Sequence, residues 1–208
     1  MKLKLLKLAV FFAALLPVAL LVWKGFHGEL GANPIEVITH ATGDWTIRFL
    51  LITLAITPLR RITGWQGWIR FRRMLGLYAF FYVLLHLTTW LWLDEFFDVH
   101  EMLADVMKRR FIMAGMTGLL LMTPLALTST KGWIRRLGRR WQKLHRLIYF
   151  SAIAGVIHYW WLVKADVRKP EIYAFLLALL LGTRVAISLR KRRTTHAPIS
   201  ERESVAAD

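Results

Sequence analysis

The sequence predicts an all-α polytopic membrane protein, a bundle of six transmembrane helices. Hydrophobic residues make up 56% of the 208 residues, above the roughly 45–50% that is usual for soluble domains. Long uncharged apolar stretches recur along almost the whole chain. Lys and Arg number 29 against 13 Asp and Glu, and the basic residues gather in alternate segments between the apolar stretches. A basic membrane protein accounts for all of these features.

Six apolar stretches approach the length that a bilayer requires, which is about 20 residues of helix with a range of roughly 17–25. The second and the sixth each contain one arginine, Arg48 and Arg184, near an end. We expect these long side chains to snorkel to the interface. The first stretch is followed by Trp-Lys-Gly-Phe-His instead of a small-residue cleavage site, so it is predicted to be retained. In order, the predicted spans are 8–23, 45–59, 74–93, 111–130, 147–163 and 172–189.

Charges in the connecting loops predict the orientation. Residues 60–73 include five basic and no acidic residues, and residues 131–146 include seven basic and none acidic. Residues 94–110 instead contain five acidic and three basic residues. The positive-inside rule therefore places both termini and both basic loops in the cytoplasm. We expect a transmembrane domain over 1–190 and a polar cytoplasmic tail over 191–208. Because the basic residues lie in short loops on one side of the bilayer, no nucleic-acid partner is expected.

Histidine is the natural metal ligand, because the chain has no Cys for thiolate sites or iron–sulfur clusters. His86 lies 13 residues beyond Arg73 in the third span, and His158 lies 12 residues beyond Arg146 in the fifth. At about 1.5 Å per residue, both histidines reach the same depth in the outer half of the membrane. Two imidazoles on facing helices are what a six-coordinate b-type haem needs.

His86 and His158 are therefore predicted to be the axial ligands of an outer haem iron. The apolar face of the porphyrin would lie against Phe80, Phe81, Tyr82 and Tyr159. The alternative is that the two histidines hydrogen-bond to each other or relay protons across the membrane.

A second, inner haem stays open, with His145 as the candidate iron ligand. His145 precedes His158 by 13 residues, a rise of roughly 20 Å. Thirteen residues at about 100° each leave about 140° of rotation, so a straight helix would not direct both imidazoles into one groove. Arg72 and Arg73 stand at the partner level of the third span. They are candidates for haem propionate or inner-haem contacts, or they act only as topology charges.

Several kinds of machinery are absent from the sequence. No G-x-G-x-x-G motif follows a strand, and about 20 residues remain after the last span, too few for a flavin or nicotinamide domain. Neither a Walker motif nor a catalytic triad occurs. We therefore predict no catalytic residues in this chain and expect its electrons to come from a separate donor.

Four segments carry a resemblance to a known family: Arg72-Arg73-Met74-Leu75-Gly76-Leu77, Leu85-His86-Leu87, residues 138–149 (GRRWQKLHRLIY) and His158-Tyr159. In this order they resemble the MsrQ (YedZ) family, the haem-binding membrane subunits of bacterial methionine sulfoxide reductase systems, within the ferric-reductase-like transmembrane group. Larger ferric reductases and NADPH oxidases place two histidines on each of two helices. This chain departs from that pattern at Arg72, so the ligand of an inner haem iron on this helix stays open.

The resemblance implies a multi-pass protein of the bacterial inner membrane that takes part in electron transport. It would take electrons from the quinone pool and pass them through haem b to MsrP. MsrP is a periplasmic molybdenum-cofactor reductase that repairs oxidised methionine in envelope proteins, and the two would form a heterodimer. Catalytic sulfoxide reduction would then belong to the partner. The resemblance also implies FMN, which would make the chain a flavoprotein.

Two other functions fit parts of the sequence. One is a haem-bearing, quinol-oxidising anchor of another reductase. The other is a non-enzymatic proton-coupled transporter, which broken helices and inverted repeats would favour. The only sign of an internal repeat is the tripeptide Thr-Pro-Leu, which occurs at 57–59 and again at 123–125.

Overall fold

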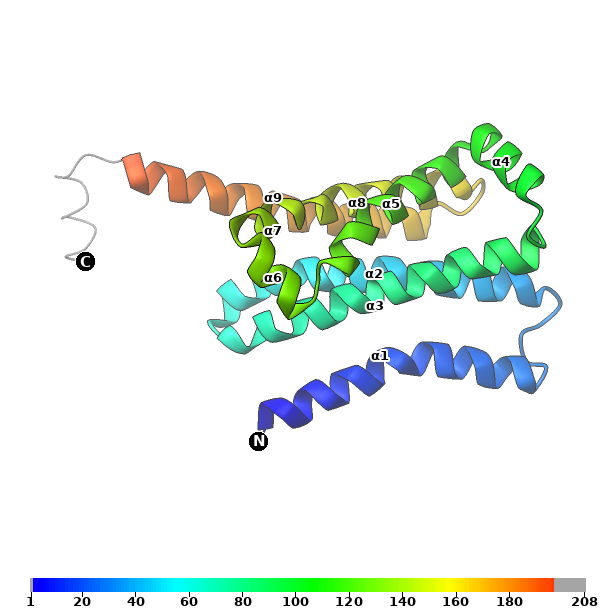
Figure 1. Cartoon of the computed structure of the whole chain (residues 1–208), viewed down its shortest axis with the longest axis horizontal. Helices are drawn as coiled ribbons and strands as arrows, with labels where there is room; N and C mark the ends of the chain where they lie inside the picture. The colour runs from blue at the N-terminus through cyan, green and yellow to red at the C-terminus, as the bar shows by residue number, and fades with distance from the viewer. Residues whose placement is uncertain (1, 197–208) are drawn as a thin grey trace.

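The computed structural model describes residues 2–196, with side chains for 2–93 and 95–189, and this part of the chain consists of helices joined by short connections (Figure 1). A 3₁₀ turn at Gln66–Trp68 precedes α3, and a π-helix at Thr89–Asp94 follows it. The α-helices are α1 Lys2–Phe26, α2 Pro34–Thr63, α3 Ile69–Thr88, α4 Val99–Lys108, α5 Arg110–Leu127, α6 Lys131–Leu137, α7 Arg139–Leu144, α8 Leu147–Leu162 and α9 Arg168–His196.

The all-helical fold is confirmed, and each of the six predicted spans lies mostly within a long helical segment. Within the described residues, four helical segments are long and apolar enough to cross a membrane on those grounds alone: Lys2–Phe26, Gln66–Leu93, Arg110–Leu127 and Arg168–Leu189. α2 and α8 are not among these four. A count of six spans therefore stays a prediction for these two helices.

The expected boundaries were wrong in several places. Residues 34–44 belong to α2, because the Asn33 side chain caps the helix by accepting a hydrogen bond from the Glu36 N–H, and Pro34 suits the first helical position. The expected loops 94–110 and 131–146 contain the short helices α4, α6 and α7. α9 begins four residues before 172 and continues past 190 to His196, while residues 197–208 of the expected tail lie outside the described residues.

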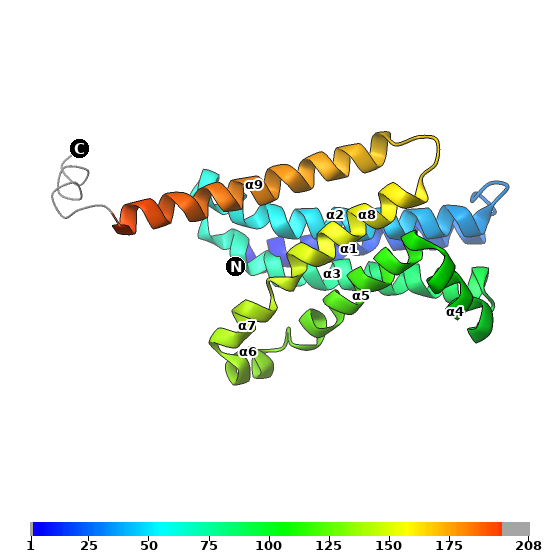
Figure 2. The ribbon, with the colours of Figure 1, turned by 90° about the horizontal axis from the view of Figure 1, so that it is seen from above.

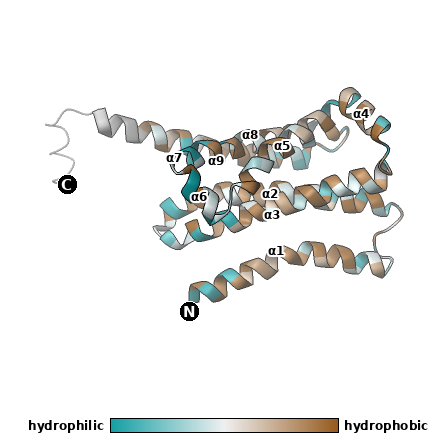
Figure 3. Cartoon of the chain, in the orientation of Figure 1, coloured by the Kyte–Doolittle hydropathy of each residue, from teal (hydrophilic) through white to brown (hydrophobic). Residues whose placement is uncertain are grey.

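Two helical hairpins form the centre of the molecule. α2 packs along α3, α5 packs along α8, and contacts between α3 and α5 and between α2 and α8 join the two pairs. α9 covers α2 and α8, and α1 contacts α2 and α3, as Figures 1 and 2 show from two directions. The core is tightest where Leu54 of α2 and Ala79 of α3 are completely buried. Hydrophobic residues also cover the outside of the long helices, which a bilayer would surround (Figure 3).

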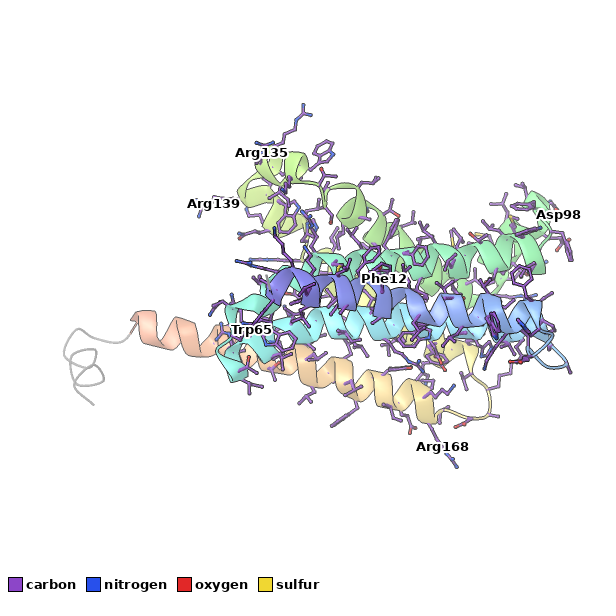
Figure 4. All side chains as sticks on the ribbon, turned by 90° about the horizontal axis from the view of Figure 1, so that it is seen from below. Phe12, Trp65, Asp98, Arg135, Arg139 and Arg168 are labelled. Carbon is purple, nitrogen blue, oxygen red and sulfur yellow. The ribbon has the colours of Figure 1, made fainter. Side chains whose placement is uncertain are left out.

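The basic loops share one end of the bundle. Figure 4 shows Arg135 and Arg139 of α6 and α7 at the same end as Trp65, with Asp98 toward the opposite end. The start of α1 and the last described turns of α9 also lie at the end of α6 and α7 (Figure 1). The described ends of the chain thus lie on the side of the basic loops, and the cytoplasmic placement of both termini stays a prediction.

The two arginines inside predicted spans both bind protein groups, and the expectation that they snorkel stays a prediction. Arg184 donates hydrogen bonds to the carbonyl of Leu54 at 2.7 Å and to the hydroxyl of Tyr149. The Leu54 carbonyl needs this donor because Pro58, four residues later, has no N–H. Arg48 lies 3.5 Å from the Asp44 carboxylate, and its Nε donates to Tyr173 at 3.1 Å.

The orientation can be tested with reporter fusions. Alkaline phosphatase joined after Glu101 should be active, and the same enzyme joined after Gly138 should be inactive, because the basic loops are retained in the cytoplasm. Colony colour and phosphatase activity per unit of fusion protein measure the result. The reverse pattern would contradict the predicted orientation.

Candidate functional site

His86 of α3 and His158 of α8 meet between the two hairpins. Their ring centroids are 5.9 Å apart and their planes cross at 81°. The prediction that the two histidines reach the same depth is therefore confirmed. Ligation of iron by these residues stays a prediction, which the following geometry supports.

Each imidazole is fixed by a backbone carbonyl of the other helix in its own hairpin. His86 Nδ1 lies 2.9 Å from the Thr39 oxygen on α2, and His158 Nδ1 lies 2.7 Å from the Phe111 oxygen on α5. A carbonyl can only accept a hydrogen bond, so in both rings Nδ1 carries the hydrogen. Both Nε2 atoms therefore keep a lone pair for a metal, and metal-binding histidines commonly have this type of second hydrogen bond.

Two glycines on the facing helices leave space for the imidazole rings. A Cβ at Gly43 would lie 3.2 Å from Cε1 of His86, and a Cβ at Gly115 would lie 2.8 Å from Nδ1 of His158. Each glycine follows the bonded carbonyl residue by four positions and precedes its histidine by 43. The sequence reasoning missed both glycines, although this repeated spacing was a signal that could have identified them.

The histidines line a cavity of about 530 Å³, within the range of small-molecule and cofactor sites. Two imidazole nitrogens on opposite sides of one metal lie about 4 Å apart, which places the ring centroids about 6 Å apart. The observed 5.9 Å matches this spacing. The walls are mainly apolar and include Leu50, Val83, Leu87, Ile112, Leu119 and Met122. The residues present therefore fit a haem held by His86 and His158.

The predicted aromatic lining was partly wrong. Tyr159 lines this cavity, whereas Phe80 lines a different one, and Phe81 and Tyr82 line neither. The Tyr82 hydroxyl instead donates to the Ala14 carbonyl of α1 at 2.9 Å. Tyr82 therefore fastens α1 to the bundle.

Polar groups that the sequence reasoning did not select also line the outer cavity. Arg109, just before α5, lines the cavity and pairs with Asp105 at 3.0 Å. Its guanidinium is the type of group that binds haem propionates. Trp90 is the second residue of the π-helix after α3, and its buried Nε1 has no hydrogen-bond partner among the described residues. Such π-helical turns frequently occur at functional sites.

His145, Arg72 and Arg73 come together at a second, inner cavity of about 220 Å³, and none of them lines the outer one. His145 lies in the turn between α7 and α8, so the rotation argument for a continuous helix does not apply to it. Its Nδ1 bonds to the Trp141 oxygen at 3.1 Å, and its ring stacks on the Trp141 ring. Burial lowers the pKa of His145 and the charge of Arg72 acts in the same direction, while the Trp141 and Leu125 carbonyls oppose them.

Comparison with known proteins gives a consistent assignment. The family described as "Ferric reductase like transmembrane component" matches residues 42–156. Three relatives bear the name "Protein-methionine-sulfoxide reductase heme-binding subunit MsrQ". The relative from Herminiimonas arsenicoxydans is 53% identical over 199 residues, covering 94% of this chain and 91% of its own.

The relative from Xanthomonas campestris pv. campestris (strain 8004) is 54% identical, covering 91% of this chain and 89% of its own. The relative from Rhodospirillum rubrum is 52% identical, covering 92% and 93%. No solved structure matches the chain.

Removal of either imidazole should remove the outer haem. We expect His86→Ala and His158→Ala each to lose the low-spin six-coordinate spectrum and most bound haem, because a bis-imidazole iron needs both ligands. His145→Ala is the matched control and should keep the outer haem. Absorption spectra of the purified protein, oxidised and dithionite-reduced, measure the effect, and a complete low-spin spectrum in His86→Ala would overturn the pairing.

Gly115→Ala should disturb the same haem without replacing either proposed ligand. The added Cβ would lie 2.8 Å from His158 Nδ1, and displacement of a supporting contact typically costs about 10–100-fold in metal affinity. Gly182→Ala in α9 is the control, because its added Cβ would meet no atom within 4 Å. Haem retention during detergent washing separates the two variants, and equal retention would contradict the proposed role of Gly115.

Proposed function

Because the chain belongs to the MsrQ family of ferric reductase-like transmembrane proteins, we propose that it passes electrons from membrane quinol through b-type haem to a periplasmic methionine sulfoxide reductase, MsrP. The observation that carries this proposal is the pair His86 and His158, with both Nδ1 atoms bound to carbonyls. We place the protein in the bacterial inner membrane, with both termini in the cytoplasm and MsrP as its partner in a heterodimer.

The two imidazoles would hold the haem from opposite sides through Nε2. When bound, the haem would supply a one-electron iron couple, which suits electron transfer. Thr39 and Phe111 keep the rings in the metal-binding tautomer, while apolar residues of both hairpins exclude water. Sulfoxide reduction itself belongs to the partner in this proposal.

The position of the cavity supports delivery of electrons to the periplasm. Its polar lining includes Asn33 before α2 and Arg109 at the start of α5, both at the opposite end from α6 and α7. By the positive-inside rule, this end faces the periplasm. Exposed charges there, such as Asp98 and Glu101 of α4 or Lys164 and Arg168 before and at the start of α9, would steer partner docking (Figure 4). Electron transfer to MsrP should then weaken as salt increases.

The transporter alternative receives less support from the fold. The two hairpins repeat, but α2 and α5 run in the same direction and so do α3 and α8 (Figure 1). The repeat is therefore parallel, whereas inverted repeats would have favoured the transporter interpretation.

The proposed function can be tested by reconstitution. Vesicles that contain the purified protein, reduced menaquinol or ubiquinol analogue, and the periplasmic reductase should reduce methionine sulfoxide in a coupled assay. His86→Ala should lower the rate at least about tenfold, because it removes an axial ligand. The exposed His100→Ala is the control.

Two outcomes would contradict parts of this proposal. Haem that stays oxidised with quinol but reduces rapidly with a cytoplasmic flavin reductase would overturn the quinol assignment. Sulfoxide turnover that is unchanged when this chain is omitted would overturn the assignment of MsrP as the acceptor.

A further inference from the structure

The wall of the outer cavity is apolar at one end and polar at the other. Toward the basic end of the bundle, its apolar residues are Ile47 and Leu50 of α2, Val83 of α3, and Leu119 and Met122 of α5. The two hydroxyls in this part, those of Thr46 and Ser151, are already bonded to backbone carbonyls. At the opposite end, the wall includes the polar residues Asn33, Glu36, His40, Trp90 and Arg109. The cavity therefore suits a ligand that is apolar at one edge and polar at the other.

Trp90 supplies a buried hydrogen-bond donor at the polar end. It follows His86 by four residues, about one helical turn, which places it about 6 Å farther from the basic end of the bundle. Its Nε1 is buried and is bonded to none of the described residues. An indole nitrogen can only donate, and buried polar atoms in folded proteins almost always have partners. This atom therefore indicates that the ligand of the cavity carries a hydrogen-bond acceptor.

Arg109 adds a positive charge at the same end, from the other hairpin. It comes two residues before Phe111, whose carbonyl holds the ring of His158. Nε of Arg109 pairs with the Asp105 carboxylate at 3.0 Å, and Asp105 is only 7% exposed. This contact orients the guanidinium and leaves both terminal amino groups for another anion. Within the described part of the chain, no other lysine or arginine lines the outer cavity.

The other carboxylates on this wall have partners of their own. Glu36 accepts a hydrogen bond of 2.9 Å from Nδ2 of Asn33. Asp44 lies 3.5 Å from Nη2 of Arg48 and 3.5 Å from Nζ of Lys169. The guanidinium and the indole N–H at the polar end are therefore available to an anionic group of the ligand.

We propose that Arg109 and Trp90 bind the propionates of the haem held by His86 and His158, and so seat it with its propionate edge toward the end of the bundle opposite α6 and α7. The proposal rests on the proposed function, which supplies the haem. A haem has the asymmetry of this cavity, because two propionate carboxylates extend from one edge and the opposite edge is hydrocarbon. A buried carboxylate is costly without partners, so the polar end is the favourable place for the propionates.

Each hairpin contributes one of the two donors. Trp90 lies beyond His86 in the first hairpin, and Arg109 lies beyond Phe111 in the second. Charge-assisted hydrogen bonds from both would hold the haem edge across the gap between the hairpins. The chain's own residues would thereby determine which edge of the haem faces the partner at the proposed periplasmic side.

The test compares haem b with its dimethyl ester, which keeps the iron and the ring but cannot carry the two negative charges. The full-length protein in lipid nanodiscs is loaded with either porphyrin, as are the variants Arg109→Leu and Trp90→Phe. Arg110→Leu and Trp92→Phe are matched controls, because both residues are exposed neighbours of the same type that do not line the cavity. The rate of haem loss to a scavenging apoglobin, the resonance Raman bands of propionate bending and the absorption spectrum are measured.

With haem b, we expect Arg109→Leu and Trp90→Phe each to lose haem about five- to tenfold faster than the unaltered protein and to shift the propionate bands, because each removes a charge-assisted hydrogen bond. The two controls should match the unaltered protein. All variants should keep the low-spin six-coordinate spectrum, since both imidazoles remain. With the dimethyl ester, the unaltered protein should lose its haem as fast as Arg109→Leu, because no charge pair is left to remove.

Three results would overturn the proposal. An effect of Arg109→Leu on haem loss that is equally large with the ester would show that the arginine acts through Asp105 and α4. Propionate bands that stay unshifted in both cavity variants would place the propionates elsewhere. In these two cases a retained six-coordinate spectrum leaves the proposed function standing, whereas an unaltered protein that takes up neither porphyrin would contradict that function as well.

Discussion

The centre of this protein depends on two hydrogen bonds between imidazole Nδ1 atoms and backbone carbonyls, those of His86 with Thr39 and of His158 with Phe111. Each bond joins the two helices of one hairpin, so it sets the axial position of one helix against the other. It also fixes which ring nitrogen carries hydrogen, and it brings the imidazole against a glycine of the facing helix, where an added Cβ would lie 3.2 Å or less from the ring. The register of the hairpin helices, the tautomer of each histidine and the need for a glycine beside it therefore all follow from the same hydrogen bond.

The two cavities show how one repeated hairpin can serve two purposes. At the outer level, α3 and α8 each supply a histidine, and the repeat is nearly symmetric. Thirteen residues earlier the equivalent positions are Arg73 and His145, so the symmetry fails. The outer site is suited to a metal between two equal ligands, whereas the inner one presents an acceptor nitrogen on one side and positive charges on the other.

Hydropathy and helical rise were sufficient to predict the helical fold, the approximate position of the long helices and the common depth of His86 and His158. These properties depend on local sequence. The start of α2 also depends on local sequence, the cap Asn33 and Pro34, but the apolar pattern begins later and placed the helix start too late. Contacts across the chain were not predictable in this way: Tyr82 binds α1 instead of lining the haem cavity, and Arg48 finds its Tyr173 partner 125 residues later. Side-chain direction decides such cases, and neither spacing nor composition specifies it.

The contact between Arg184 and the Leu54 carbonyl has a consequence for how the protein is made. Pro58 leaves this carbonyl without its helical donor, and no water is present in a bilayer core to replace it. The donor lies on α9, 130 residues later, and chains emerge from the ribosome with the N-terminus first. The Leu54 carbonyl therefore gains this donor only once α9 is in place beside α2, so the last helix completes the hydrogen bonding of the second.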